Sequence, residues 1–464
     1  MIDNMRRNMR HVFWLFFLLF LFVAGFLIKL AVFDARDIAS HPSNRRLRAT
    51  NTDRLPGMIL DRNGHILAES TATEDGGHTR EYRYGAAFAH ALGTRQSGTG
   101  LETKYNFDLQ SLDAELWQRL VQFFTGRPIE GNTVVSTLDA ALQVAAYEGL
   151  NGRRGAVVAI EPSTGRILAM VSAPDFPLSA SSEDWRALLA DDENGPLLNR
   201  AAQGLYAPGS TFKLIVAAAA LEHSMDDLTI TCTGSATFGS YSMRCFDAKA
   251  HGAVNLDSAM AQSCNVYFAT LGEQLGAAAL QDIATRFGFN QTMDYPLAYR
   301  LSSFVLREGA GRNEMIETAI GQGRTLATPL QMATVAATIA NDGVMMSPQL
   351  LDSVQTRDLY VLEQQAPKEI GAIVTPEIAA RLEELMVGVV SSGTGTLAQV
   401  KGITVTGKTG TAENATGNDH SWFIGYAPAE GPTIAVAVLL EETGGGTAAT
   451  RLAGEIMAAY LAAE

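Results

Sequence analysis

A long apolar run near the N-terminus places the strongest constraint on this chain. Residues 12–33 read VFWLFFLLFLFVAGFLIKLAVF, and their only charge is Lys29, near one end. As an α-helix this run would rise about 33 Å, enough to cross a hydrocarbon core of ~30 Å, and a lysine near its end can snorkel to the interface. The run therefore predicts one transmembrane helix, against the alternatives of a buried core helix and a cleaved signal peptide.

The charges on either side of the run predict its orientation. Three arginines precede it and two aspartates follow it: Arg6, Arg7, Arg10, Asp34 and Asp37. Because basic flanks stay in the cytoplasm, residues 1–11 are expected inside and the rest of the chain outside. A signal peptide is the better rival, but its apolar region is usually ~7–15 residues long, and no small-x-small cleavage site follows cleanly here. The prediction is a single-pass protein of the cytoplasmic membrane.

The chain is acidic, with a formal net charge of −14. This balance disfavours nucleic-acid binding, because phosphates are bound by clustered lysines and arginines. The three cysteines are too few for a disulfide scaffold and include no Cys-x-x-Cys pair that would indicate zinc. Cys232 and Cys245 bracket a Gly/Ser-rich loop. Outside the membrane they fit either a disulfide or two separate buried thiols.

The hydrophobic pattern beyond the apolar run favours an α+β fold. Residues 34–55 read as a linker, residues 58–60 and 66–68 as a hairpin around Asp-Arg-Asn-Gly, and residues 107–127 as a helix. From Gly155 onward, helices are expected in the middle of the segment and strands at both ends, which favours an α+β layer over alternating βαβ units. The strands are expected at 156–160, 167–171, 421–426 and 433–440, and apolar helices at 214–221 and 330–339.

A serine and a lysine three residues apart form the first candidate catalytic group. Pro208-Gly209 breaks the chain, and a helix beginning at Ser210 would place Lys213 on the same face. A desolvated lysine amine is a usable base for a serine hydroxyl, and a helix N-terminus can stabilise an oxyanion. The alternative is an N-cap serine beside a surface lysine. Only Lys213 among the seven lysines has a serine three residues earlier, and its apolar neighbours disfavour a solvated face.

Two further motifs follow along the chain. Ser263 and Asn265, in AQSCNVYF, can point into one cleft, where a hydroxyl relays a proton and a carboxamide binds an amide. Taken alone they also fit a helix cap. Cys264 between them is expected to be a small buried apolar residue rather than a nucleophile, since no histidine lies nearby in the sequence.

The third motif is Lys-Thr-Gly-Thr, which follows an apolar run. On a strand, Lys408 and Gly410 would share one face, and Thr409 and Thr411 the other. Gly410 would let a substrate backbone approach, and the lysine and threonines would attract a carboxylate. The alternative is an ordinary lysine on an edge strand.

The order of the motifs, Ser-x-x-Lys, then Ser-x-Asn, then Lys-Thr-Gly, is far more specific than any one of them. Further stretches carry the same signal, namely 155–174, 199–213, 321–333, 391–398 and 421–428. In these residues the chain resembles the transpeptidase domain of the penicillin-binding proteins. The upstream stretches 97–105 and 123–143 resemble the pedestal of the class B members, and the compact layout is most similar to the penicillin-binding protein A type. One departure is Pro56-Gly57, which stands where the family has an Arg-Gly pair.

This resemblance implies a serine β-lactamase/transpeptidase-like domain on a small pedestal. The domain is expected to have a central antiparallel sheet with helices on both faces. The implied divisions are a cytoplasmic tail at 1–11, a transmembrane helix at 12–33, a pedestal at 34–154 and a transpeptidase domain at 155–464. The pedestal leaves no room for a glycosyltransferase domain.

The implied activity is that of a peptidoglycan D,D-transpeptidase, which cross-links stem peptides through a serine acyl-enzyme and releases D-alanine. Ser210 would be the nucleophile, Lys213 the base and Ser263 the proton relay to the leaving amine. The backbone N–H groups of Ser210 and Thr411 would form the oxyanion hole. The residues expected to bind substrate are Asn265, Lys408, Thr409, Gly410 and Thr411. No metal and no cofactor are implied.

The resemblance also implies partners: donor and acceptor stem peptides, β-lactams, the cytoplasmic membrane and a polytopic glycan polymerase. A β-lactamase would share the motifs but would not normally keep an anchor and a pedestal. A D,D-carboxypeptidase would use water in place of the acceptor amine, and the motifs do not separate it from a transpeptidase. A β-lactam sensor would need an effector larger than 11 cytoplasmic residues, and a scaffold with a dead site would be expected to lose a motif residue.

Overall fold

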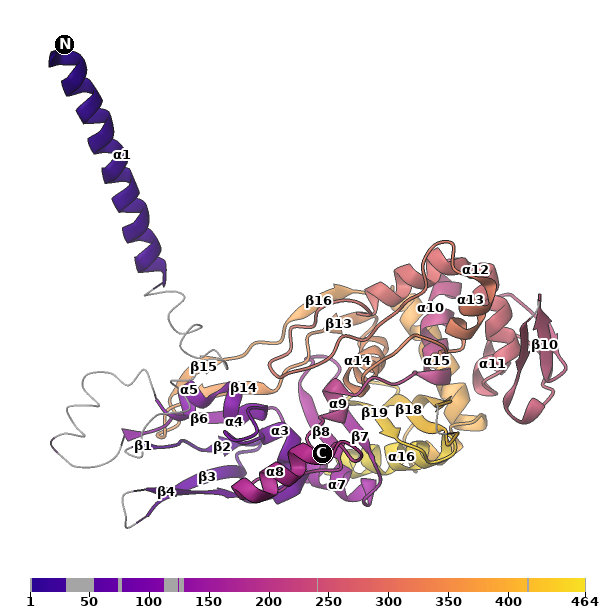
Figure 1. The fold of residues 1–464 in the computed structure, drawn as a ribbon. Coiled ribbons are helices and arrows are strands. Elements are labelled where there is room, and N and C mark those ends of the chain that lie inside the picture. The colour runs from indigo at the N-terminus through magenta and orange to yellow at the C-terminus, as the bar shows by residue number, and fades with distance from the viewer. Residues whose placement is uncertain are drawn as a thin grey trace.

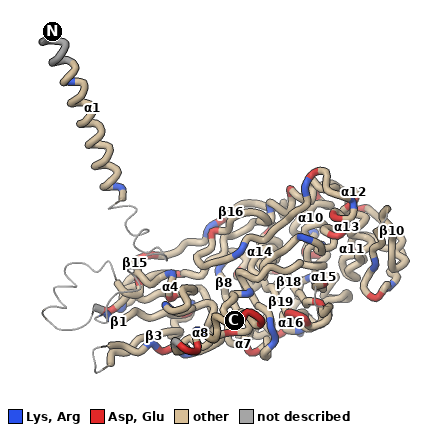
Figure 2. The backbone as a smooth tube through the Cα atoms, viewed as in Figure 1, with Lys and Arg blue, Asp and Glu red and all other residues tan. Residues whose placement is uncertain are grey.

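The computed structural model describes residues 2–30, 54–73, 77–111, 124, 129–239, 241–414 and 417–463 (Figure 1). Helix α1 spans Ile2–Ile28, and its stretch Asn8–Ile28 has a mean hydropathy of 2.6 with none of it buried. Figure 2 shows Lys and Arg on this helix only near its ends. Among the described residues it is the one helix long and apolar enough to cross a membrane, as expected from the sequence. Residues 31–33 of the predicted span lie outside the described part.

The centre of the C-terminal region is a five-stranded antiparallel sheet in the order β17-β18-β19-β7-β8. Its strands are β7 Gly155–Ile160, β8 Ile167–Ala173, β17 Thr406–Ala412, β18 His420–Ala427 and β19 Ile434–Leu440. The chain enters the sheet through β7 and β8 and completes it with its last three strands. The strands predicted at both ends of this region are therefore confirmed.

Alternate residues of each strand enter two different hydrophobic cores. Ala156 and Val158 join the core that contains α14 (Pro329–Ala340), whereas Val157 and Ala159 join the core that contains α16 (Thr447–Leu461). Because side chains alternate along a strand, helices cover both faces of the sheet, and the central strands β7 and β19 are apolar throughout. The predicted fold class is confirmed.

A second sheet joins distant parts of the chain in the order β15-β14-β6-β2-β3-β4. The predicted hairpin is present, with β2 paired antiparallel to β3 across the Asp-Arg-Asn-Gly turn. Strands β14 and β15 come from far along the chain and pair onto β6. The bounds are β2 Ile59–Leu60, β3 Ile66–Ala72, β4 His78–Tyr82, β6 Thr133–Ser136, β14 Leu351–Gln355 and β15 Val361–Gln364.

The prediction of a helix at 107–127 is wrong for its first residues. The structure has one short helix there, α5 (Asn106–Leu109), which ends before Ser111, a residue with a left-handed φ of 43°. The backbone N–H of Asn132 donates to the carbonyl of Asp108, so this segment is tied to the strand region rather than continued as a helix. Most of residues 112–127 lie outside the described part.

The predicted apolar helices at 214–221 and 330–339 correspond to α10 (Lys213–Glu222) and α14. The other helices of the body are α3 Ala89–Leu92, α4 Gly100–Lys104, α7 Ala140–Leu150, α8 Ser182–Ala190, α9 Arg200–Gln203, α11 Leu256–Ala261, α12 Asn265–Arg286, α13 Arg312–Ala319 and α15 Pro376–Ser392. Short 3-10 helices are η3 Gly85–Phe88, η4 Gly209–Phe212, η5 Phe246–Ala248 and η6 Thr396–Ala398. The remaining strands are β1 Arg54–Leu55, β5 Ile129–Glu130, β9 Ile230–Cys232, β10 Ser235–Phe238, β11 Tyr241–Arg244, β12 Gly252–Val254, β13 Val344–Met346 and β16 Glu369–Ala372.

Candidate active site

Ser210 lies in the 3-10 turn η4, which continues into α10. Residues 213–220 of α10 are all buried, so the turn that carries Ser210 is anchored by the centre of the core. Ser210 itself is partly exposed at the start of this helix. The sequence predicted this arrangement, except that the first turn is 3-10 rather than α-helical.

Two glycines allow η4 to approach strand β17. Gly209 has a φ of 54°, and a Cβ built on it would lie 2.4 Å from the carbonyl oxygen of Thr411. On the strand, a Cβ on Gly410 would lie 2.9 Å from Thr211 Cγ2. Only residues without a side chain fit at this distance, so the Ser210 turn and the Lys-Thr-Gly strand form one side of the site together.

Ser263 and Asn265 form the other side, at the junction of α11 and α12. Ser263 has a left-handed φ of 56°, and Cys264 caps α12 by accepting a hydrogen bond from the backbone N–H of Tyr267. Asn265 is therefore the first residue of α12. Its carboxamide donates to the carbonyl of Arg244 at 2.9 Å, which ties this junction to the strand β11.

The amine of Lys213 reaches across from α10 to this junction. Its Nζ lies 2.8 Å from the carbonyl oxygen of Ser263, 3.2 Å from Ser263 Oγ and 2.7 Å from Asn265 Oδ1. The side chain is fully buried, and this burial lowers the pKa of Lys213 to about 7, because desolvation penalises the ammonium form. A substantial share of the neutral amine near pH 7 gives the site a base.

The hydroxyl of Ser263 lies between two lysines. Lys408 Nζ donates to Ser263 Oγ at 3.0 Å and to the carbonyl of Thr409 at 2.9 Å. Burial, followed by the charge of Lys213, lowers the pKa of Lys408 well below its usual value. A hydroxyl offers two lone pairs and one proton. With both lone pairs facing lysines, the proton of Ser263 is left to donate elsewhere, for example to a substrate nitrogen.

The threonines of the third motif differ in their surroundings. The Thr409 hydroxyl is buried and lies 2.6 Å from Thr394 Oγ1, whereas Thr411 is partly exposed and its carbonyl accepts a hydrogen bond from Gln322 Nε2 at 3.3 Å. Thr394 and Gln322 were not predicted as site residues, although both lie in stretches that carry the family resemblance. Nothing in the local pattern indicated that they would reach β17.

The segment before Ser210 is braced by a buried ionic group that was also missed. Tyr206 donates its hydroxyl proton to Glu441 Oε1 at 2.6 Å, and Arg200 Nε donates to the same oxygen at 2.8 Å. Arg154 pairs with the second oxygen of Glu441 at 2.8 Å. These contacts hold the approach to the nucleophile against the end of β19.

The predicted site residues therefore meet from three segments of the chain. Lys213, Ser263, Asn265 and Lys408 are joined by hydrogen bonds. Within the described part of the chain, no hydrogen bond joins the hydroxyl of Ser210 to Lys213. The protons of the Lys213 ammonium face Ser263 and Asn265, so a lone pair for Ser210 becomes available only when the amine loses a proton. The arrangement can bind an acyl donor and move its protons through Lys213 and Ser263.

Comparison with known protein families identifies the class of protein. Residues 155–458 match the family model described as the penicillin binding protein transpeptidase domain, and residues 56–134 match that of the penicillin binding protein A dimerisation domain. The chain belongs to the penicillin-binding protein transpeptidase family.

Its relatives include peptidoglycan D,D-transpeptidases. The chain is 37% identical to the peptidoglycan D,D-transpeptidase PbpA of Mycolicibacterium smegmatis over 93% of each chain, and 36% identical to PbpA of Mycobacterium tuberculosis over 90% of this chain and 91% of the relative. It is also similar to the imipenem acyl-enzyme complex of penicillin-binding protein A from M. tuberculosis, with a TM-score of 0.82, 34% identity, and coverage of 88% of this chain and 99% of that one. The predicted class, a penicillin-binding serine D,D-transpeptidase of the penicillin-binding protein A type, is confirmed, while the individual residue roles stay predictions.

Proposed function

We propose that this chain cross-links peptidoglycan by transferring the acyl group of a D-alanyl-D-alanine stem peptide, through Ser210, to the amine of a neighbouring stem. The observation that carries the proposal is the convergence of Lys213 Nζ and Lys408 Nζ on the hydroxyl of Ser263. This convergence supplies a base with a lowered pKa and a hydroxyl whose proton is free to be donated.

In the acylation step, neutral Lys213 accepts the Ser210 proton while Ser210 Oγ attacks the carbonyl between the two D-alanines. The backbone N–H groups of Ser210 and Thr411 stabilise the oxyanion. Collapse of the tetrahedral intermediate breaks the C–N bond. The leaving amine takes a proton from Ser263, which Lys408 and Lys213 restore, and D-alanine departs.

The residues around Ser263 and the two lysines bind the donor stem peptide. We assign the terminal carboxylate to the hydroxyl of Thr411, beside the ammonium of Lys408, since the hydroxyl of Thr409 is occupied by Thr394. The carboxamide of Asn265 contacts Lys213 and Arg244 in the free enzyme. It therefore positions the base, and it binds the substrate amide by exchanging one of these contacts. Gly410 leaves space for the donor backbone.

An acceptor amine then attacks the acyl-enzyme, returns its proton through the same relay and releases the cross-link from Ser210. Helix α1 anchors the enzyme in the cytoplasmic membrane, with residues 34–464 outside as a pedestal (34–154) and a transpeptidase domain (155–464). The expected partner is a polytopic glycan polymerase in the same membrane, contacted through the anchor and the pedestal.

The test is the intact mass of the full-length chain in detergent after exposure to a penicillin. We expect a stable adduct of one drug mass on the wild type and on a Ser391→Ala control, and none on Ser210→Ala. Rapid return to the free mass with drug consumed would indicate a β-lactamase, and no adduct on any protein would remove the catalytic assignment. A donor peptide supplied with a D-amino acid then separates aminolysis, expected here, from the hydrolysis of a carboxypeptidase.

A further inference from the structure

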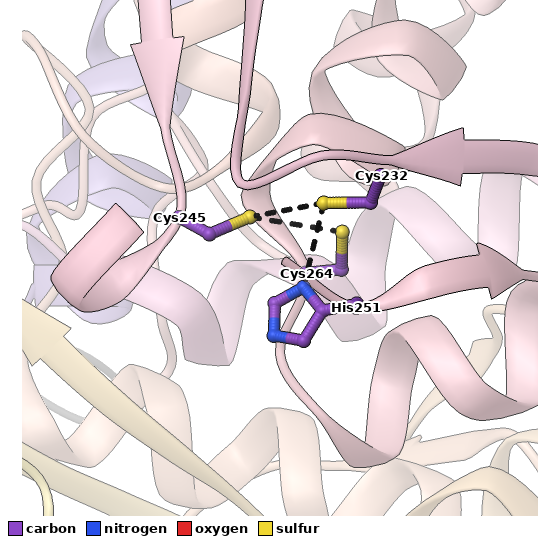
Figure 3. Close-up of side chains that lie close together, drawn as sticks. All are labelled: Cys232, Cys245, His251 and Cys264. Atoms are coloured by element: carbon purple, nitrogen blue, oxygen red, sulfur yellow. Dashed lines mark hydrogen bonds between the residues drawn. The ribbon is translucent and has the colours of Figure 1, made fainter. Parts of the chain in front are cut away.

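Three cysteines and a histidine that are far apart in the sequence meet beside the Ser263 junction. Cys232, Cys245, His251 and Cys264 bring their Sγ and ring nitrogen atoms within 4.8 Å of one another, and in Figure 3 these atoms point toward one another. All three cysteines are buried and free, and His251 is partly buried. We call these four residues the Cys/His cluster.

The backbone of each cluster residue is already fixed. Cys232 ends β9, and its carbonyl accepts a hydrogen bond from the N–H of His251 at 3.1 Å, directly before β12. The N–H of Cys245 donates to the carbonyl of Gly234 at 3.0 Å. Cys264 is the N-cap of α12. The four side chains are therefore held in place by strand pairing and a helix start rather than by their contacts with one another.

Three of the six separations among the ligand atoms fit a tetrahedron around a metal ion, and all six are within 4.8 Å. The Sγ atoms of Cys232 and Cys245 are 3.7 Å apart, those of Cys245 and Cys264 3.8 Å, and Cys232 Sγ lies 3.5 Å from His251 Nδ1. With Zn–S bonds of ~2.3 Å and Zn–N bonds of ~2.0–2.1 Å, a tetrahedral site places sulfur atoms about 3.8 Å apart and a sulfur about 3.5–3.6 Å from the nitrogen. The three observed separations match these values.

We propose that the Cys/His cluster binds one zinc ion as a structural site. Three thiolates and one imidazole are a ligand set typical of zinc, and four protein ligands close its tetrahedral coordination. No local sequence pattern indicates this site, because 12, 5 and 12 residues separate successive ligands and no short cysteine pair is present. The fold brings the four ligands together although they are far apart in the sequence.

The ion would hold the second catalytic motif in place. Cys264 lies between Ser263 and Asn265, and Asn265 donates to the carbonyl of Arg244, the residue before Cys245. Each partner in this hydrogen bond is therefore next in sequence to a proposed ligand of the ion: Asn265 to Cys264, and Arg244 to Cys245. This consequence rests on the proposed function, whereas metal binding itself does not.

A disulfide between Cys232 and Cys245 is the rival, since the proposed location outside the membrane permits one. It would join two of the sulfurs and leave Cys264 and His251 without a role in the cluster. The two occupants are distinguished by composition: zinc requires three thiols and one metal ion per chain, and the disulfide one thiol and no metal.

The deciding experiment uses the full-length chain, purified in detergent without a histidine tag and without added metal. Elemental analysis by mass spectrometry and thiol titration in denaturant are expected to give one zinc and three thiols per chain. X-ray absorption at the zinc edge should show three sulfur ligands at ~2.3 Å and one nitrogen at ~2.0–2.1 Å. One thiol without zinc would establish the disulfide. Three thiols that take up no zinc under reducing conditions, or a shell without sulfur, would overturn the proposal.

Replacing the histidine ligand by another zinc ligand separates the loss of zinc from misfolding of the variant. We expect His251→Gln to lose zinc, His251→Cys to keep it through a fourth thiolate, and the control His223→Gln, outside the cluster, to keep it as well. A displacement of ~1 Å at a catalytic group costs on the order of 100-fold. Penicillin acylation of His251→Gln should therefore slow by ~10- to 100-fold, with the rate recovered in His251→Cys. Equal rates with zinc lost would remove the positioning role, and zinc without acylation in the wild type would count against the proposed function alone.

Discussion

The two sides of the candidate active site are held by different kinds of structure. Ser210 lies on η4, which continues into α10, and Lys213 is the first of the eight buried residues that begin α10, while Lys408 lies on β17 in the central sheet. Ser263 and Asn265 stand on a junction backed by the short strands β9 to β12, most of whose residues are exposed or partly exposed. The first side is fixed by a large apolar core, whereas the second joins helices α11 and α12, which enter that core, to a peripheral segment with little core of its own.

The residues buried in this peripheral segment show what replaces a core there. Within the described residues 230–254, the buried side chains other than alanine are Cys232, Phe238, Met243, Cys245 and Val254. Two of these five are members of the Cys/His cluster. Small units that cannot bury much apolar surface usually depend on disulfides or metals, and the proposed zinc ion would have the same role for this segment.

The largest effect should come from the base on the core side. Replacing Lys213 by Gln removes general-base catalysis, so the rate of penicillin acylation should fall by ~10²- to 10⁴-fold, measured with a fluorescent penicillin. Lys249→Gln, an exposed lysine of the peripheral segment, should leave the rate unchanged. If Lys213→Gln acylates within a few-fold of the wild type while circular dichroism shows it folded, Lys213 is not the base.

The next effect tests how closely the two core elements must approach. Gly209→Ala would place a Cβ 2.4 Å from the Thr411 carbonyl and push η4 away from β17, so acylation should slow by on the order of 100-fold. Gly431 has a similar φ of 67° but open space around it. Gly431→Ala shares only the left-handed strain of about 1–2 kcal/mol and should show that cost in thermal unfolding, with acylation unaffected. Equal acylation in the two variants would mean that the close approach is not required.

The pH dependence should report the burial of Lys213. Burial lowers the pKa of Lys213 to about 7, so the amine is mostly protonated below that pH and mostly neutral above it. Only the neutral amine accepts a proton, so the acylation rate should rise with pH, by about tenfold per unit below the pKa, and level off above it. Rates measured from pH 5 to pH 9 check this. A rate that stays flat across pH 7 in the wild type would contradict the assignment of Lys213 as the base.

Local sequence patterns predicted the core side far better than the peripheral side. The helix after Ser210 is a continuous apolar segment, and the strand carrying Lys408 was indicated by the Lys-Thr-Gly motif that follows an apolar run. The meeting of Lys213 and Lys408 at Ser263 joins residues 50 and 145 positions apart. No local pattern contains such a contact, and only the order of the motifs indicated it.

Other features were missed for the same reason. Strands β14 and β15 extend the N-terminal sheet from residues more than 200 positions later, and the Cys/His cluster assembles across two hairpins and a helix cap. Cys264 was correctly expected to be buried, but His251 lies close to it only in the fold. The helix predicted at 107–127 follows an apolar pattern that tertiary contacts of Asp108 interrupt.

The smallest effect should come from the contact that ties the two sides together. Thr394 has no role in the proposed chemistry, but it contacts both sides of the site. Its N–H donates to the carbonyl of Ala261 at the end of α11, and its hydroxyl contacts that of Thr409 on β17. Thr394→Val removes the hydroxyl contact, which should cost about 1 kcal/mol of unfolding free energy and slow acylation by only a few-fold. Thr394→Ser retains the hydroxyl and should restore both, as thermal unfolding and acylation rates would show. If Thr394→Val slowed acylation as much as Gly209→Ala does, the peripheral side would depend on the Thr394 contact more than on the Cys/His cluster. No change in either measurement would mean that each side is held independently of the other.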